Sequence, residues 1–196
     1  MAKLLHPGFD GPSPHPAPQE SIRSRRATRE QRRAESVRRG LVERIAVLND
    51  TWRVVDLSSV AAARRGFLVI GPGGVFALTL RDHGRSRITF AGDNVQIDGK
   101  RPLYVEEARL DAEAASERLS NAASVSIPVV PLLVLSGSGK VSFYGLPRRC
   151  VVTSHQGLPW VLNARGQRLS PTTVNKVFAL ARHPRTWLDE SGTPTG

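Results

Sequence analysis

The spacing of apolar residues along the chain predicts three helices, with strands between them. Apolar residues recur at every third or fourth position over residues 34–48, which predicts an amphipathic helix from about residue 21 to residue 48. A second helix is predicted over residues 102–120, and a third begins at Ser170, which is an N-cap residue followed by Pro171 in the first turn. The buried positions expected on these helices are Ala34, Val37, Leu41, Ile45 and Leu48, then Val105, Ala108, Ala112, Ala115 and Leu119, then Val174, Val177, Phe178 and Ala181.

Short apolar and β-branched runs between the helices predict strands. Residues 67–70 show no polar alternation, as in a strand that is buried on both faces. They run through Gly71-Pro72-Gly73-Gly74 into residues 75–80, which predicts a β-hairpin. Pro131 suggests that the strand containing it is an edge strand or has a bulge. The further predicted strands are residues 52–57, 87–91, 95–98, 129–135, 141–143 and 150–153.

The order of these elements predicts an α/β protein with a central sheet flanked by helices. Five prolines in residues 1–20 predict a flexible, disordered arm without helix or strand. We therefore expect that arm, a basic helical extension over residues 21–37, one folded domain over residues 38–187, and a flexible tail over residues 188–196.

The charge of the chain favours a polyanionic partner. The formal net charge is +11, and residues 21–44 hold nine arginines against three glutamates. The positive charge could also reflect genome composition alone, because only four of the 28 basic residues are lysine, as in proteins from GC-rich genomes.

Several classes of protein do not fit the composition. The single cysteine, Cys150, excludes an intramolecular disulfide framework, and its place in an apolar run predicts a small buried side chain. No apolar run has the length of a signal peptide or a membrane span. We therefore expect a cytoplasmic protein with no membrane partner.

The hairpin and its surroundings carry a family resemblance. The strand at residues 52–55, the run from Leu68 to Phe76, and the segment from Asp98 to Leu103 resemble the nuclease-related domain (NERD) family, a branch of the PD-(D/E)-x-K superfamily. The similarity extends over roughly residues 38–187. It implies a restriction-endonuclease-like core, in which helices flank a central mixed β-sheet.

The catalytic pattern of that family is largely missing here. The resemblance implies two or three carboxylates and a lysine around a divalent cation that activates water. The helix glutamate of the family falls on Glu43, its strand aspartate on Gly66, its second strand acid on Thr79 and its lysine on Arg81. Because one acid of three remains, these positions are interpreted as vestigial, and no metal or other cofactor is expected.

The substitutions favour holding a phosphate over hydrolysing its ester. Arg81 would repel a dication, whereas arginine grips phosphate bidentately. We therefore expect a non-catalytic nuclease-fold protein that binds DNA or RNA through arginine–phosphate contacts. The arginines expected to bind nucleic acid are Arg23, Arg25, Arg26, Arg29, Arg32, Arg33, Arg38, Arg39, Arg64, Arg65, Arg81, Arg85 and Arg87.

Two other functions remain open from the sequence. A divergent nuclease could use Glu43, Asp56 or Asp82 to hold a single Mg²⁺ ion. Alternatively, a scaffold protein could dock its basic helix on an acidic protein partner.

Overall fold

The structure is a computed structural model that describes residues 28, 32, 35–45, 51–60, 66–137 and 139–188. The chain divides into two compact units, residues 1–36 and 37–196. The predicted proline-rich arm, most of the predicted helical extension and the predicted tail beyond Leu188 lie outside the described residues. Helix is described at residues 35–45.

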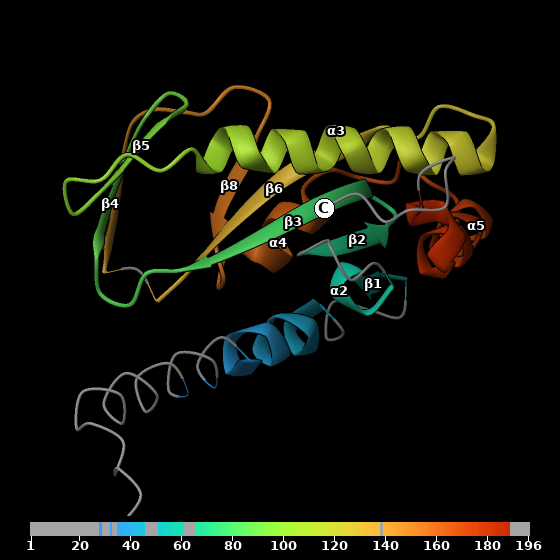
Figure 1. Cartoon of the computed structure of the whole chain (residues 1–196), viewed down its shortest axis with the longest axis horizontal. Helices are drawn as coiled ribbons and strands as arrows, with labels where there is room; N and C mark the ends of the chain where they lie inside the picture. The colour runs from blue at the N-terminus through green and yellow to red at the C-terminus, as the bar shows by residue number, and fades with distance from the viewer. Residues whose placement is uncertain are drawn as a thin grey trace, which may run out of the picture. The chain divides into compact units, whose positions relative to one another are not determined.

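A five-stranded mixed sheet forms the centre of the larger unit (Figure 1). Its first three strands pair with one another in antiparallel, and its last two extend the sheet parallel to the third. The strand order is β1 (Arg53–Asp56), β2 (Phe67–Gly71), β3 (Gly74–Asp82), β6 (Val129–Ser136) and β8 (Val151–Ser154). The predicted α/β class, the central mixed sheet and the glycine-rich hairpin are confirmed.

Helices cover both faces of this sheet. On one face, α3 (Tyr104–Ala123) and α5 (Pro171–Arg182) pack on alternate residues of β2 and β3, together with η1 (Pro184–Trp187). On the other face, residues 37–45 and α4 (Leu158–Asn163) pack on the remaining residues of these strands. The strand β2 is consequently covered on both faces, and its residues Phe67–Ile70 are all buried, as their unbroken apolar run predicts.

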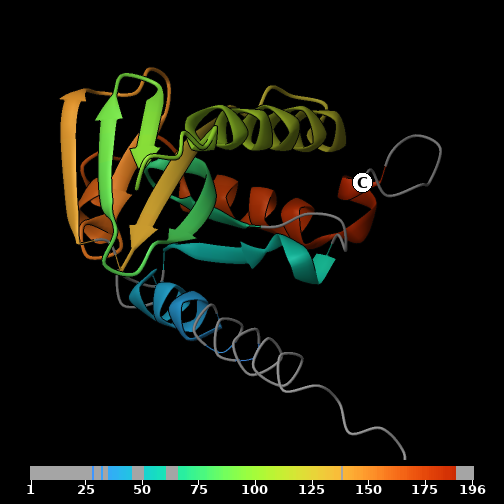
Figure 2. The ribbon, with the colours of Figure 1, turned by 60° about the vertical axis from the view of Figure 1, so that its left-hand side comes forward.

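A second, three-stranded sheet packs against the first turns of α3, and Figure 2 shows it beside the central sheet. Ile88 and Phe90 share a core there with Val105 of α3. Its strand order is β5 (Asn94–Ile97), β4 (Arg87–Ala91) and β7 (Lys140–Gly145). Its strands are predicted from the sequence, but their separation into another sheet is not.

The periodicity of the long helix is confirmed residue by residue. All five positions predicted for the buried face of α3 are its buried residues. In α5, Val174, Val177 and Ala181 are buried, and the Ser170 side chain accepts a hydrogen bond from the Thr173 amide. The short helices α2 (Leu57–Val60) and α4 are not predicted, because one or two turns carry too little periodicity.

Pro131 does not mark an edge strand, because β6 lies between β3 and β8. The strand β8 begins to pair with β6 only at Leu132. Proline therefore stands one residue before the β8 ladder, where its missing amide proton costs no hydrogen bond to β8.

Cys150 is buried, as predicted, and lies in the core beneath the second sheet. Burial raises the pKa of its thiol to about 11. The thiol is therefore protonated at neutral pH and behaves as a small apolar side chain.

The glycine-rich turn has a packing explanation. A Cβ atom on Gly71 would lie 2.2 Å from Cε3 of Trp52, whose side chain is 6% exposed. The carbonyl of Pro72 accepts hydrogen bonds from the amides of Arg168 and Leu169, at 2.7 and 3.0 Å. The turn thus serves as a packing surface for an indole ring and as an anchor for the loop before α5.

Replacing Gly71 with alanine is expected to lower the free energy of unfolding by about 1–3 kcal/mol, because the methyl group overlaps the Trp52 ring. Gly40→Ala is the matched control. Gly40 lies in a helix, and the nearest described atoms to its added Cβ are 3.9 Å away, so this variant should be neutral or gain up to about 1 kcal/mol. Urea denaturation measures both; equal effects of the two substitutions would contradict the packing explanation.

Candidate functional site

Thr79 and Arg81, the two predicted site residues on β3, face α3 and contact carboxylates there. The Thr79 hydroxyl donates to Asp111 Oδ2 at 3.3 Å, and Arg81 Nη2 donates to Glu107 Oε2 at 2.6 Å. The guanidinium carbon of Arg81 also lies 4.8 Å from the centroid of the Tyr104 ring. Because Glu107 and Asp111 are four residues apart, they occupy one face of the helix.

The charge at this position is compensated internally. Arg81 forms an ion pair with Glu107, so this carboxylate already has a cationic partner. A divalent cation beside Glu107 would either displace the Arg81 guanidinium or be repelled by it. The arrangement joins β3 to α3, and Asp111 on the neighbouring turn accepts the hydrogen bond from Thr79.

Gly66, where the resemblance places the first strand acid, lies directly before β2. Its successor Phe67 pairs with Leu78, which places Gly66 beside the Thr79 end of the hairpin. The backbone of Gly66 has φ +110°, and an added Cβ would lie 3.0 Å from the Leu78 carbonyl oxygen. Residues other than glycine rarely adopt this backbone conformation, so an aspartate here would strain the backbone.

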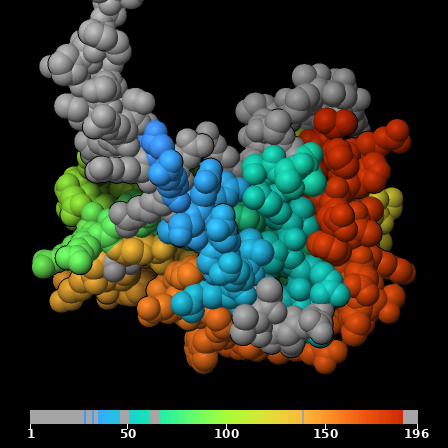
Figure 3. All heavy atoms as spheres, turned by 90° about the horizontal axis from the view of Figure 1, so that it is seen from below, coloured from blue at the N-terminus to red at the C-terminus, as the bar shows by residue number. Residues whose placement is uncertain are grey.

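Glu43 does not join these three residues. Its side chain is exposed, while Leu41 and Ile45 of the same helix share a core with Phe76 and Leu78. Those residues alternate with Thr79 along β3, so the helix packs on the opposite face of the sheet. Figure 3 shows this face, with residues 37–45 in blue. The structure thus brings Gly66, Thr79 and Arg81 together but not Glu43.

The other two acids considered from the sequence have local structural partners. Asp56 accepts hydrogen bonds from Arg38 Nη2 and the Ser58 hydroxyl, both at 2.6 Å, and from the Ser58 amide at 3.0 Å. Burial favours a higher pKa for Asp56, but the hydrogen bonds from Ser58 and Arg38 outweigh it and hold the pKa below its usual value of 3.8. Asp82 accepts from the Gly84 amide at 3.1 Å. Within the described ranges, no three His, Cys, Asp or Glu side chains form a group suited to a metal ion.

A cationic corner, formed by Arg85, Arg87 and Lys140, lies where β3 passes into β4 and β6 into β7. Arg87 and Lys140 are direct partners in the parallel β4–β7 ladder, and both side chains are exposed. The next pair, Ile88 and Val141, belongs to the core, so the cations share the outward face. Hydrogen bonds from the Gly139 amide to the Ser86 carbonyl and from the His83 amide to the Ser136 carbonyl, both 3.1 Å, join the two loops.

An exposed aromatic ring stands further along the same strand. Tyr144 is 83% exposed. The β4–β7 ladder pairs Phe90 with Phe143 but Ala91 with Gly145, which makes Tyr144 the extra residue of a β-bulge. Bulges redirect side chains, and this one presents the phenol on the edge strand. The sequence analysis missed both Lys140 and Tyr144, because only the pairing of distant strands brings them to the arginines.

The predicted nucleic-acid-binding arginines divide into three groups. Arg38 and Arg81 are engaged in the ion pairs described above. Arg32, Arg39, Arg85 and Arg87 are exposed. The remaining residues lie outside the described residues: Arg23, Arg25, Arg26, Arg29, Arg33, Arg64 and Arg65.

Comparisons of the chain with protein-family models, curated proteins and solved structures gave no match. The resemblance to the nuclease-related family therefore stays a prediction from the hairpin and its flanking segments. Among the described residues, no helix is both long and apolar enough to cross a membrane.

Asp56→Asn is expected to lower the free energy of unfolding at pH 7 by about 0.5–1 kcal/mol, since the ion pair with Arg38 is half-exposed. Because the pKa of Asp56 is lower in the folded state than in the unfolded state, ionised Asp56 stabilises the folded protein at pH values above its unfolded-state pKa. This stabilisation is lost as the pH falls through the folded-state pKa. The difference between the two proteins should therefore narrow below about pH 4. Urea denaturation at pH 7 and pH 3 measures this difference. Glu117→Gln, at an exposed carboxylate of α3, controls for charge alone; a loss of equal size there would refute the assignment.

Gly66→Asp is expected to destabilise the protein by about 1–3 kcal/mol, because of the positive φ and the contact with the Leu78 carbonyl. Gly66→Ala separates backbone strain from charge and should cost a similar amount. Thermal or urea unfolding measures both variants. A stable Asp variant beside an unstable Ala variant would show that the site accepts an acid.

Proposed function

We propose that this protein binds nucleic acid without cleaving it, through phosphate contacts from exposed arginine and lysine side chains. The observation that carries the proposal is the pair of exposed cations, Arg87 and Lys140, held directly opposite each other on neighbouring strands. Like charges in this position are unfavourable by themselves. A phosphate bound between them would offset that repulsion, and Arg85 extends the positive surface.

The coarse architecture is compatible with a nuclease ancestry. The mixed sheet flanked by helices is what the resemblance to the nuclease-related family implies. We assign the finer fold to the restriction-endonuclease-like class as part of the proposal. Its support is the hairpin of β2 and β3 with its Gly-Pro-Gly-Gly turn.

The environment of Arg81 opposes metal-dependent catalysis. In the family pattern this position holds a lysine next to metal-bound carboxylates, whereas here a guanidinium is paired with Glu107. The position of the strand acid is a glycine with a backbone that disfavours side chains. Both features oppose the assembly of a dication site, which needs several charged oxygen ligands.

Tyr144 adds a second kind of contact to the proposed surface. An exposed ring on the same strand as Lys140 can stack on an unpaired base, while the cations hold the backbone. Because the cationic corner presents three basic side chains, we expect phosphate contacts to dominate and sequence preference to be weak.

The affinity for a nucleic acid duplex is expected to fall with salt, with a slope of about −5 in a plot of log affinity against log salt concentration, as for six phosphate contacts. The double variant Arg87→Ala/Lys140→Ala should make this slope shallower by about 2, because two contacts are lost. Fluorescence anisotropy with DNA and RNA duplexes over a range of salt concentrations measures the slopes.

The matched control is Lys176→Ala/Arg182→Ala, which removes the same charge from exposed positions on α5. It should leave the slope close to that of the unchanged protein. Equal loss in both double variants would mean that net charge, not the cationic corner, governs binding. Chelator-sensitive cleavage of the duplex in Mg²⁺ or Mn²⁺ would overturn the non-catalytic assignment.

A further inference from the structure

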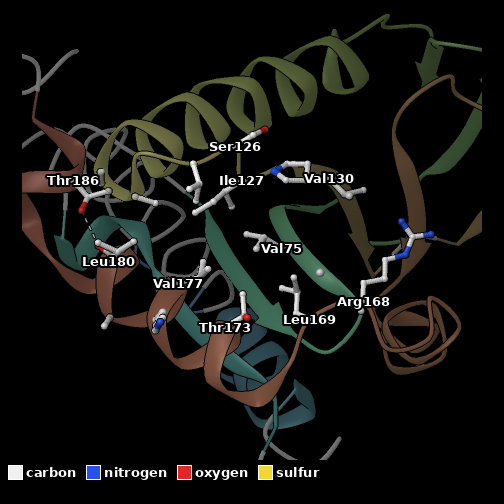
Figure 4. A pocket seen from close by; sticks show the side chains of 18 of the residues that line it. Val75, Ser126, Ile127, Val130, Arg168, Leu169, Thr173, Val177, Leu180 and Thr186 are labelled. Carbon is white, nitrogen blue, oxygen red and sulfur yellow. Dashed lines mark hydrogen bonds between the residues drawn. The ribbon is translucent and has the colours of Figure 1, made fainter.

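A large apolar cavity lies between α3 and α5 (Figure 4), and its described lining includes no residue of the cationic corner. Its volume is about 1200 Å³, somewhat above the usual range for small-molecule sites. Val75, Ile127 and Val177 line it and are buried members of the core between the helices and the sheet. Val125, also in the lining, is 62% exposed. The cavity is therefore an opening in the main core layer that reaches the protein surface.

The lining of the cavity combines aliphatic side chains with basic ones. The apolar lining is aliphatic, and the described lining residues include no Phe, Tyr or Trp and no Asp or Glu. His183 contributes the one imidazole of the described lining, so a nucleobase or other planar ring would find little aromatic surface there. The lysine and arginine residues of the lining are Arg165, Arg168, Lys176 and Arg185. The other polar side chains of the described lining are Ser126, Thr173, His183 and Thr186, and none of them is an acid. An aliphatic wall with cations and no carboxylate matches an aliphatic chain that ends in an anion.

The end of the cavity at Arg165 and Arg168 is the better place for the anion. The amide of Arg168 is held on the Pro72 carbonyl at 2.7 Å, and Arg165 lies beside the same turn, where its Cβ would be 3.3 Å from a Cβ added to Gly73. This end also adjoins the N-terminus of α5, whose partial positive charge favours an anion. Arg185 follows the C-terminus of the same helix, where the partial charge has the opposite sign.

We propose that the cavity binds a long-chain aliphatic carboxylate. The carboxylate is held by Arg165 and Arg168, and the chain runs between α3 and α5 past Val177 towards Leu180. This assignment does not depend on nucleic acid binding, since it uses different residues. Arginine at both carboxylate contacts provides bidentate hydrogen bonds, and the aliphatic wall provides affinity that grows with chain length.

Titration of the full chain with dodecanoate, tetradecanoate and hexadecanoate, each below its critical micelle concentration, tests the proposal. Affinity should rise about tenfold for each pair of methylene groups added. Hexadecanol, which has the same chain without the charge, should bind at least tenfold more weakly than hexadecanoate. Calorimetry or displacement of a fluorescent fatty acid measures these affinities.

Three variants make the test specific. Arg165→Ala/Arg168→Ala should weaken hexadecanoate binding at least tenfold and leave hexadecanol unchanged. Val125→Glu, at an exposed position of the lining, should weaken binding of the acid more than of the alcohol. Arg87→Ala/Lys140→Ala removes the same charge as the first variant but lies outside the lining, so it should leave both affinities unchanged.

The proposal is overturned if hexadecanoate binds no better than dodecanoate or hexadecanol, or if it does not bind. It is also overturned if both double variants weaken hexadecanoate equally, because that result would reflect net charge. Binding of an acidic amphipathic peptide in preference to the fatty acid would assign the cavity to a protein partner instead.

Discussion

The burial of β2, β3 and β6 on both faces constrains the rest of the fold. A sheet with apolar residues on both sides needs a covering layer on each, and the chain supplies α3 and α5 on one side and residues 37–45 with α4 on the other. The turn between β2 and β3 then has to fit between these layers. Gly71 leaves space for the Trp52 ring, and the Pro72 carbonyl accepts hydrogen bonds from the loop before α5. The strand pattern and the glycine-rich turn thus answer one packing requirement.

Polar residues gather where the buried sheet ends. Thr79 and Arg81 occupy the last part of β3, beyond the fully apolar stretch, and find their partners on α3. The same continuation of β3 and β6 carries the chain into the second sheet, where Arg87 and Lys140 become neighbours. The two candidate surfaces have different origins: one follows from strand pairing at the rim, and the other is a gap between helices that do not fully close over the core.

The sequence predicts the local elements better than their partners. The five buried positions of α3 and the hairpin are read correctly, because regular spacing of apolar residues reflects burial directly. The Arg81–Glu107 contact and the Arg87–Lys140 pairing are not predictable in this way, since each joins segments far apart in the chain. Glu43 illustrates the same limit: the family resemblance predicts a place for it in a site, but the side of the sheet that its helix covers depends on packing.

The lone cysteine has a practical consequence. Because the Cys150 thiol is buried and stays protonated near neutrality, alkylating reagents should react with it slowly in the folded protein. A cysteine introduced at an exposed position would then be the preferred site for attaching a dye or a spin label, with no need to remove the native one. Two such labels, one within the first 36 residues and one at an exposed position of the larger unit, would give distances between the two units in solution.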